Sequence, residues 1–150
     1  MEWISLASTA LGALVGLGAT FVLDQARWRR ESEQRRRDDR RAVYTSFLAA
    51  TAEASEILFN IAHGHDTDAS ATSRAQTVIR DSAVLSRRLE LSLVAAPAVM
   101  REANRLVDRL RDYRRAVGQG PAEDTQAVDQ ARVAYNEQRD RLVEVMRGTL

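Results

Sequence analysis

The chain has 150 residues, a formal net charge of +1 and no cysteine. The absence of thiols excludes disulfides, cysteine nucleophiles and thiolate metal sites, and the balanced charge gives no overall basic field for nucleic acid. All 22 basic residues are arginine, which we attribute to coding bias, so arginine counts are weak evidence for phosphate binding.

An uncharged apolar segment, residues 4–23, dominates the N-terminal part of the chain. As a helix it is about 30 Å long, which matches the hydrocarbon core of a bilayer. The only tryptophans, Trp3 and Trp28, bracket it, and tryptophan favours the membrane interface. We therefore expect residues 1–23 to form a transmembrane anchor, with these interface residues: Trp3, Trp28, Arg27, Arg29 and Arg30.

Arginines follow this segment but do not precede it. Positive residues stay on the cytoplasmic side, so we expect a single-pass protein of the cell inner (plasma) membrane, with its N-terminus outside and its C-terminal domain cytoplasmic. Two alternatives stay open. A cleaved signal peptide would carry its positive charge before the apolar run, and a buried helix of a soluble protein would tolerate the serines, threonines and glycines here.

Small residues recur every four positions along the apolar segment and so share one helix face. The central pair has the Gly-x-x-x-Gly spacing that lets two membrane helices approach closely. This pattern predicts helix–helix packing in the membrane, and hence self-association, although small residues are also common in membrane helices generally. The predicted packing residues are Ser8, Gly12, Gly16 and Thr20.

Residues 24–41 are rich in arginine, with acids interleaved at helical i, i+4 spacing. We expect this segment to be a juxtamembrane stalk that continues the membrane helix. It has two interpretations: binding of anionic lipid head groups, or a stop-transfer signal on a solvated helix, which we favour. The interleaved acids argue against nucleic acid as a partner.

Residues 42–150 read as a cytoplasmic helical bundle. Apolar positions step by three and four from Tyr44 to Ile61, and Gly64 should end this first helix. The loop 63–70 holds both histidines. His63, His65, Asp66 and Asp68 are possible metal ligands, but so dense a polar cluster is more often a solvated turn. We predict no metal and no other cofactor.

A second bundle helix is expected over residues 71–94, ending before Pro97. Its stripe is Val78, Ser82, Leu85, Leu89 and Ser92. Residues 89–94, Leu-Glu-Leu-Ser-Leu-Val, alternate like a strand, but an isolated strand has nothing to pair with.

Two further helices show heptad seams. One begins at Pro97 and ends near Gly118, and the next begins near Pro121. The fold class is therefore all-α: an N-terminal transmembrane helix that continues into an antiparallel bundle of about four long helices. Alanine, serine, threonine and glutamine at seam positions suggest a thin core. The seams are Val99, Ala103, Leu106, Leu110, Tyr113 and Val117, and then Val128, Ala131, Tyr135, Gln138, Leu142 and Val145.

The layout resembles that of the uncharacterised small single-span membrane proteins of high-GC Gram-positive bacteria. Three segments carry this resemblance: ISLASTALGALVGLGATFVL, WRRESEQRRRDDRRAVYTSFL and LVAAPAVMREANRLVDRL. No activity attaches to that group, so the resemblance implies none.

The chain contains no nucleotide-binding loop, nucleophile elbow or zinc helix. We therefore expect a non-enzymatic, membrane-anchored interaction or scaffold protein. Its expected partners are the bilayer and either a second copy of itself or another helical protein, with no small-molecule substrate. Two alternatives stay open: a membrane-perturbing protein of the phage or toxin kind, and a membrane-linked sensor or regulator.

Overall fold

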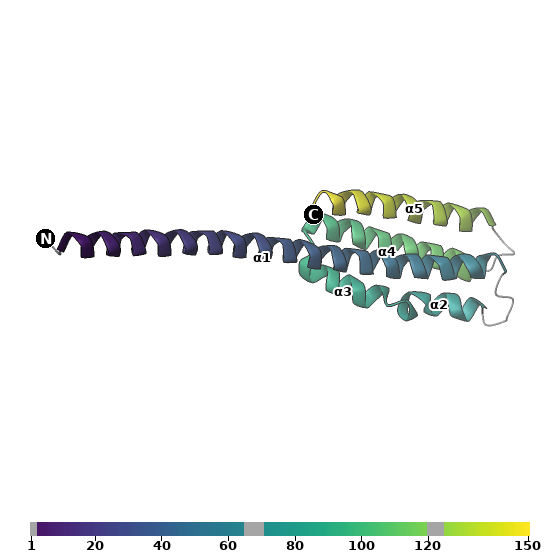
Figure 1. Ribbon diagram of the computed structural model, residues 1–150. Helices are drawn as coiled ribbons and strands as arrows, with labels where there is room; N and C mark the ends of the chain where they lie inside the picture. The colour runs from purple at the N-terminus through teal and green to yellow at the C-terminus, as the bar shows by residue number, and fades with distance from the viewer. Residues whose placement is uncertain (1–2, 65–70, 120–124) are drawn as a thin grey trace. The chain divides into compact units, whose positions relative to one another are not determined.

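The computed structural model describes the backbone of residues 3–64, 71–119 and 125–150, and the side chains of residues 33–64, 73–119 and 126–150. The described chain is helical throughout its regular structure and has no strand. It divides into two units, residues 1–39 and residues 40–150. The helices are α1 (Trp3–Ala62), α2 (Ala71–Asp81), α3 (Val84–Val94), α4 (Pro97–Gly118) and α5 (Thr125–Arg147) (Figure 1).

Residues 40–150 form an up-and-down helical bundle. The part of α1 in this unit runs in one direction, α2 and α3 return end to end, α4 runs out again and α5 returns (Figure 1). Short connections between consecutive helices favour this antiparallel order. The bundle predicted from the sequence is confirmed at this level. In the part of the chain whose side chains are described, no helix is both long and apolar enough to cross a membrane. The predicted anchor, residues 1–23, lies outside that part.

The bundle segment of α1 buries the stripe predicted from its spacing. Phe47, Ala54 and Leu58 have no exposed surface, and Tyr44, Thr51 and Ile61 are also buried. The helix ends at Ala62, and Gly64 follows with φ of +69°. Glycine adopts that left-handed conformation without a steric penalty, which explains why the helix stops here.

The helices α4 and α5 also bury their predicted seams. Every predicted seam position of α4, from Val99 to Val117, is buried, and Pro97 occupies its first turn. In α5, Val128, Tyr135 and Leu142 are buried together with Gln138, whereas the two remaining seam positions are half-buried. The predicted start near Pro121 lies outside the described residues.

The single helix predicted over residues 71–94 is wrong, because the chain breaks between α2 and α3. The backbone of Ala83 is left-handed, with φ of 58° and ψ of 13°. Just before it, the hydroxyl of Ser82 donates to the carbonyl of Val78 at 2.7 Å, a local bond that competes with helix continuation. The break makes five described helices from the predicted four, although α2 and α3 together occupy one position in the bundle (Figure 1).

The break also moves the buried stripe by one residue. The sequence placed Leu85, Leu89 and Ser92 in the core, but all of them are exposed. The buried positions of α3 are instead Val84 and Leu91. A left-handed residue changes the direction of the chain, so the helical phase read through Ala83 does not carry from α2 into α3.

Candidate interaction surface

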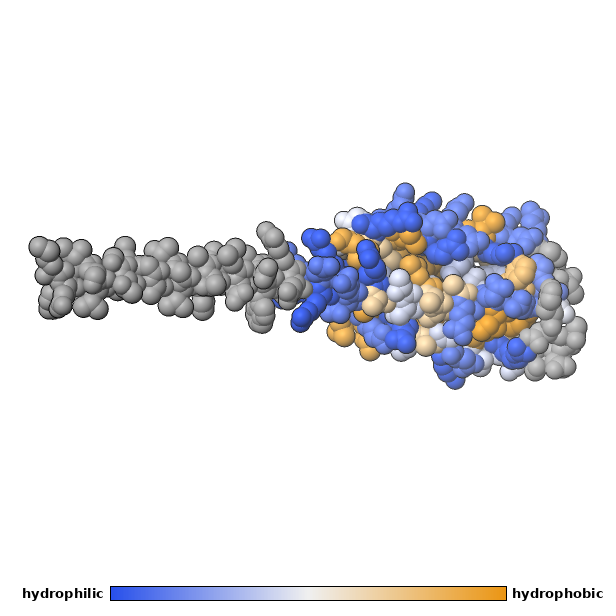
Figure 2. Space-filling view, in the orientation of Figure 1, coloured by the Kyte–Doolittle hydropathy of each residue, from blue (hydrophilic) through white to orange (hydrophobic). Residues whose placement is uncertain are grey.

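Three leucines at i, i+4 and i+8 line the outer face of α3, and we call them the leucine row: Leu85, Leu89 and Leu93. Their exposed fractions are 47%, 67% and 80%. Residues at this spacing lie one above another on a helix. Figure 2 shows apolar residues reaching this face of the bundle among hydrophilic ones. The row therefore places three exposed leucines along one side of α3.

The core contacts of α3 hold the row outward. Val84 and Leu91 are fully buried on the opposite side of the helix. On one flank, Nε of Arg88 donates to the side-chain oxygen of Asn104 on α4 at 2.7 Å. This bond and the buried pair set the rotation of α3 about its axis.

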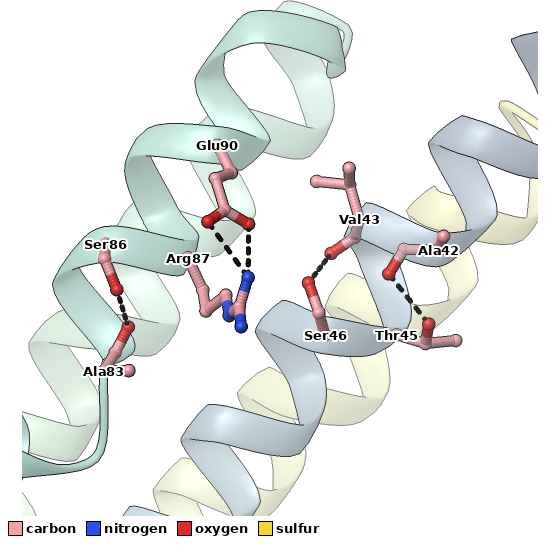
Figure 3. Close-up of polar contacts among 8 residues, drawn as sticks. All are labelled: Ala42, Val43, Thr45, Ser46, Ala83, Ser86, Arg87 and Glu90. Carbon is pink, nitrogen blue, oxygen red and sulfur yellow. Dashed lines mark hydrogen bonds and ion pairs between the residues drawn. The ribbon is translucent and has the colours of Figure 1, made fainter.

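The other flank of α3 carries an ion pair on the side next to α1. Nη1 of Arg87 donates to both carboxylate oxygens of Glu90, at 2.8 and 2.9 Å. Figure 3 shows these two side chains facing the segment of α1 that contains Val43 and Ser46. Both members of the pair are nearly half exposed, at 44% and 45%. The row is thus bordered by charge on both flanks.

Another exposed apolar residue, Val133, lies on α5 and is 55% exposed. The other side chains described on the outer face of α5 are mostly polar. Open hollows on this face are lined by Gln126, Asp129, Gln130, Val133, Ala134 and Glu137, and by Asp140, Arg141, Val143, Glu144 and Arg147. A single exposed valine is normal on a protein surface, so Val133 serves below as a control position.

The end of α1 holds the described histidine, His63. Its ring stacks on Phe59 with centroids 3.9 Å apart, and its Nδ1–H donates to the Phe59 carbonyl at 2.9 Å. The guanidinium of Arg132 lies over the ring of Phe59, 4.1 Å from its centroid. Among the residues whose side chains are described, no group of three or more potential ligands could hold a metal. His65, Asp66 and Asp68 lie outside them.

Two tyrosine hydroxyls are buried in the bundle. The pKa of Tyr113 is raised to about 12, mainly because burial disfavours the phenolate. Burial is also the main cause that raises the pKa of Tyr135, whose hydroxyl has no hydrogen-bond partner among the described groups. A phenol with a raised pKa is a poor acid, and both rings are within the core, so these groups serve packing rather than chemistry.

The site residues predicted from the sequence lie where no side chain is described. These are the packing residues Ser8, Gly12, Gly16 and Thr20 and the interface residues Trp3, Trp28, Arg27, Arg29 and Arg30, all within residues 1–32. They remain predictions.

Sequence reasoning missed the leucine row, although one signal pointed to it. Leu89, Leu91 and Leu93 alternate with polar residues. Within a helix, positions spaced by two lie about 200° apart, so these leucines cannot all face the core.

Comparison with protein families, curated proteins and solved structures found no match to this chain.

Proposed function

We propose that this protein is a non-enzymatic, membrane-anchored interaction protein whose helical bundle docks a helical partner on the leucine row. The observation that supports the proposal is the exposure of Leu85, Leu89 and Leu93 on one face of α3. Burying one leucine side chain stabilises a contact by about 1.5–3 kcal/mol. A partner that covers the row therefore gains from each leucine.

The position of the row supports docking rather than folding. The bundle is closed around a core to which α3 contributes Val84 and Leu91, whereas the leucine row lies on the opposite side of the same helix. Contiguous exposed apolar residues with a polar border are typical of interaction sites. An apolar anchor at residues 4–23 would hold such a surface close to a membrane-bound partner.

Photo-cross-linking from single cysteines tests the interaction in native membranes, because the chain has none of its own. Leu89→Cys, loaded with a photoreactive maleimide, should give discrete adducts, and the additional change Leu85→Glu should remove them. Val133→Cys is the matched control, since it is also exposed and apolar. Equal adducts at both positions, or none at Leu89, would contradict the proposal.

Labelling at Gly118 tests the anchor separately. A Cβ there would meet no atom within 4 Å, so Gly118→Cys should leave the bundle intact. We expect the protein in the membrane fraction and the thiol to react with an impermeant maleimide only after cell lysis. Recovery in the soluble fraction would refute the anchor, and labelling of intact cells would refute the orientation.

A further inference from the structure

We propose that the occupant of the leucine row is the same row on a second copy of this chain, with the two α3 helices parallel. This inference rests on the proposed function, to which it adds the partner and its orientation. A two-fold axis along the helices would bring Leu85, Leu89 and Leu93 each against its own counterpart. Such an interface is isologous, the commonest kind in homodimers.

The charges beside the row have opposite signs on its two flanks. Arg88 precedes Leu89 and Glu90 follows it, so their side chains leave the helix about 100° to either side of the central leucine. The side-chain contacts agree, because Arg88 reaches Asn104 on α4 whereas Glu90 lies with Arg87 on the side next to α1 (Figure 3). One border of the row thus carries Arg88, and the other carries the Arg87–Glu90 ion pair, in which Glu90 lies nearer the row than Arg87 does.

This arrangement favours parallel pairing. When two identical helices pair in parallel, opposite flanks meet, so Arg88 of one copy lies beside Glu90 of the other, and the reverse contact forms as well. When they pair antiparallel, like flanks meet, and each charge lies beside its own copy. Charges on the flanks of helix pairs set orientation in this way. Opposite charges attract only in the parallel case.

Both groups have capacity for the new contact. Glu90 is 45% exposed and accepts its two hydrogen bonds from a single nitrogen of Arg87. A carboxylate offers about four acceptor positions, so it can accept a second arginine. The bond to Asn104 engages only Nε of Arg88, and guanidinium has five N–H donors.

The course of the chain agrees with the parallel arrangement. In the bundle unit, residues 40–62 of α1 run opposite to α3 (Figure 1). Two copies with parallel α3 helices therefore have their residue-40 ends on the same side. Antiparallel pairing places these ends on opposite sides, so parallel pairing is the arrangement in which both copies present the same end toward an anchor at residues 4–23.

The size of the row indicates that this contact needs a membrane to concentrate it. The surface that three leucines of one short helix can bury is well below the roughly 800 Å² per partner of a standard interface. Anchoring both copies in one bilayer raises the effective concentration of each bundle near the other. A weak contact between free bundles is then sufficient between anchored chains.

Disulfide cross-linking of the full chain in native membranes tests the orientation. The single variants are Leu85→Cys, Leu89→Cys and Leu93→Cys, with Val133→Cys as the control on α5. Parallel pairing predicts a covalent homodimer from each of the three row variants and none from the control. Antiparallel pairing predicts a homodimer from Leu89→Cys alone, and a disulfide between Leu85→Cys and Leu93→Cys when these two variants are coexpressed. That result would overturn the inference.

Other outcomes separate this inference from the proposed function. Adducts at Leu89 that contain a different protein and no homodimer would overturn the second copy as partner and leave the proposed function standing. No adduct and no homodimer at Leu89 would overturn both.

A charge exchange tests the flank contact in the Leu89→Cys background. Parallel pairing predicts that Arg88→Glu or Glu90→Arg alone lowers homodimer yield about three- to tenfold, and that the double change restores it. Arg111→Glu on α4 is the matched control and should change nothing. Thermal unfolding of each variant verifies the fold. Equal yields from all variants, or no recovery in the double variant, would overturn the orientation.

Discussion

The side-chain amide of Gln138 on α5 donates to the carboxylate of Glu102 on α4 at 2.8 Å, and to the backbone carbonyl of the same residue at 3.3 Å. Gln138 is buried at a seam position, and Glu102 also accepts a hydrogen bond from Arg105. A glutamine within an apolar seam therefore joins the two helices through a charged acceptor instead of leaving its amide unpaired.

Removing this amide should weaken the bundle. We expect Gln138→Ala to lower the free energy of unfolding by about 1–2 kcal/mol, because a hydrogen bond to a charged group is lost. Urea unfolding at pH 7 measures the change. Gln130→Ala, at an exposed position of the same helix, should have almost no effect. Equal losses from both variants would show that the hydrogen bond is not the cause.

The same pair predicts a pH dependence. The hydrogen bond from Gln138 is the main cause that lowers the pKa of Glu102 below its ordinary value of 4.5. The unfolded chain therefore binds this proton at a higher pH than the folded chain. The stabilisation is fully present above pH 4.5 and is lost as the pH falls through the lowered folded pKa. The difference in free energy of unfolding between wild type and Gln138→Ala should shrink over that range. A constant difference down to pH 3 would contradict the assignment of this pH dependence to the Gln138–Glu102 hydrogen bond.

Two leucines on α3 should respond very differently to truncation. Leu91 is fully buried and Leu89 is 67% exposed. We expect Leu91→Ala to cost about 2–5 kcal/mol, the usual range for a core leucine, and Leu89→Ala to stay within about 0.5 kcal/mol. Chemical unfolding in detergent micelles measures both. Similar losses would mean that the leucine row belongs to the folding core.

Ala83 should tolerate glycine better than a helical alanine does. Its φ of 58° is unfavourable for a residue with a Cβ. We expect Ala83→Gly to leave the free energy of unfolding unchanged or to raise it by up to about 1 kcal/mol. Ala52→Gly, at an exposed position within α1, should lower it by about 1 kcal/mol. Thermal unfolding of the two variants decides. A cost at Ala83 as large as at Ala52 would disprove the strain.

The hydroxyl of Tyr113 should be dispensable. It is buried without a hydrogen-bond partner among the described groups, whereas the hydroxyl of Tyr44 lies 3.1 Å from that of Thr149. We expect Tyr113→Phe to be neutral or slightly stabilising and Tyr44→Phe to cost about 0.5–1.5 kcal/mol. The reverse order in unfolding experiments would refute this assignment.

Tyr113 also predicts alkaline behaviour. Burial raises its folded pKa from 10.0 to about 12, so the unfolded chain loses this proton first. Ionisation of this group therefore leaves the free energy of unfolding unchanged below pH 10 and lowers it as the pH rises through 12. Wild type should lose stability across this interval, and Tyr113→Phe should lose less. An identical loss in both proteins would exclude Tyr113 as a source.

The sequence predicts the helices that have one unbroken period and a clear end. In α4, Pro97, the seam from Val99 to Val117 and Gly118 all agree, because each of these features acts within a few residues of the chain. The same holds for α1 from Tyr44 to Gly64. Local propensity and the apolar period are properties of the sequence itself, so they can be read without the fold.

Tertiary structure decided the break at Ala83 and, through it, the surface at which we expect binding. An alanine gives no local signal for a left-handed backbone, since the conformation costs free energy that only packing elsewhere repays. The turn lets Val84 and Leu91 reach the core, and this leaves Leu85, Leu89 and Leu93 exposed. Which leucines α3 buries depends on the positions of α1 and α4, and no spacing within residues 71–94 contains that information.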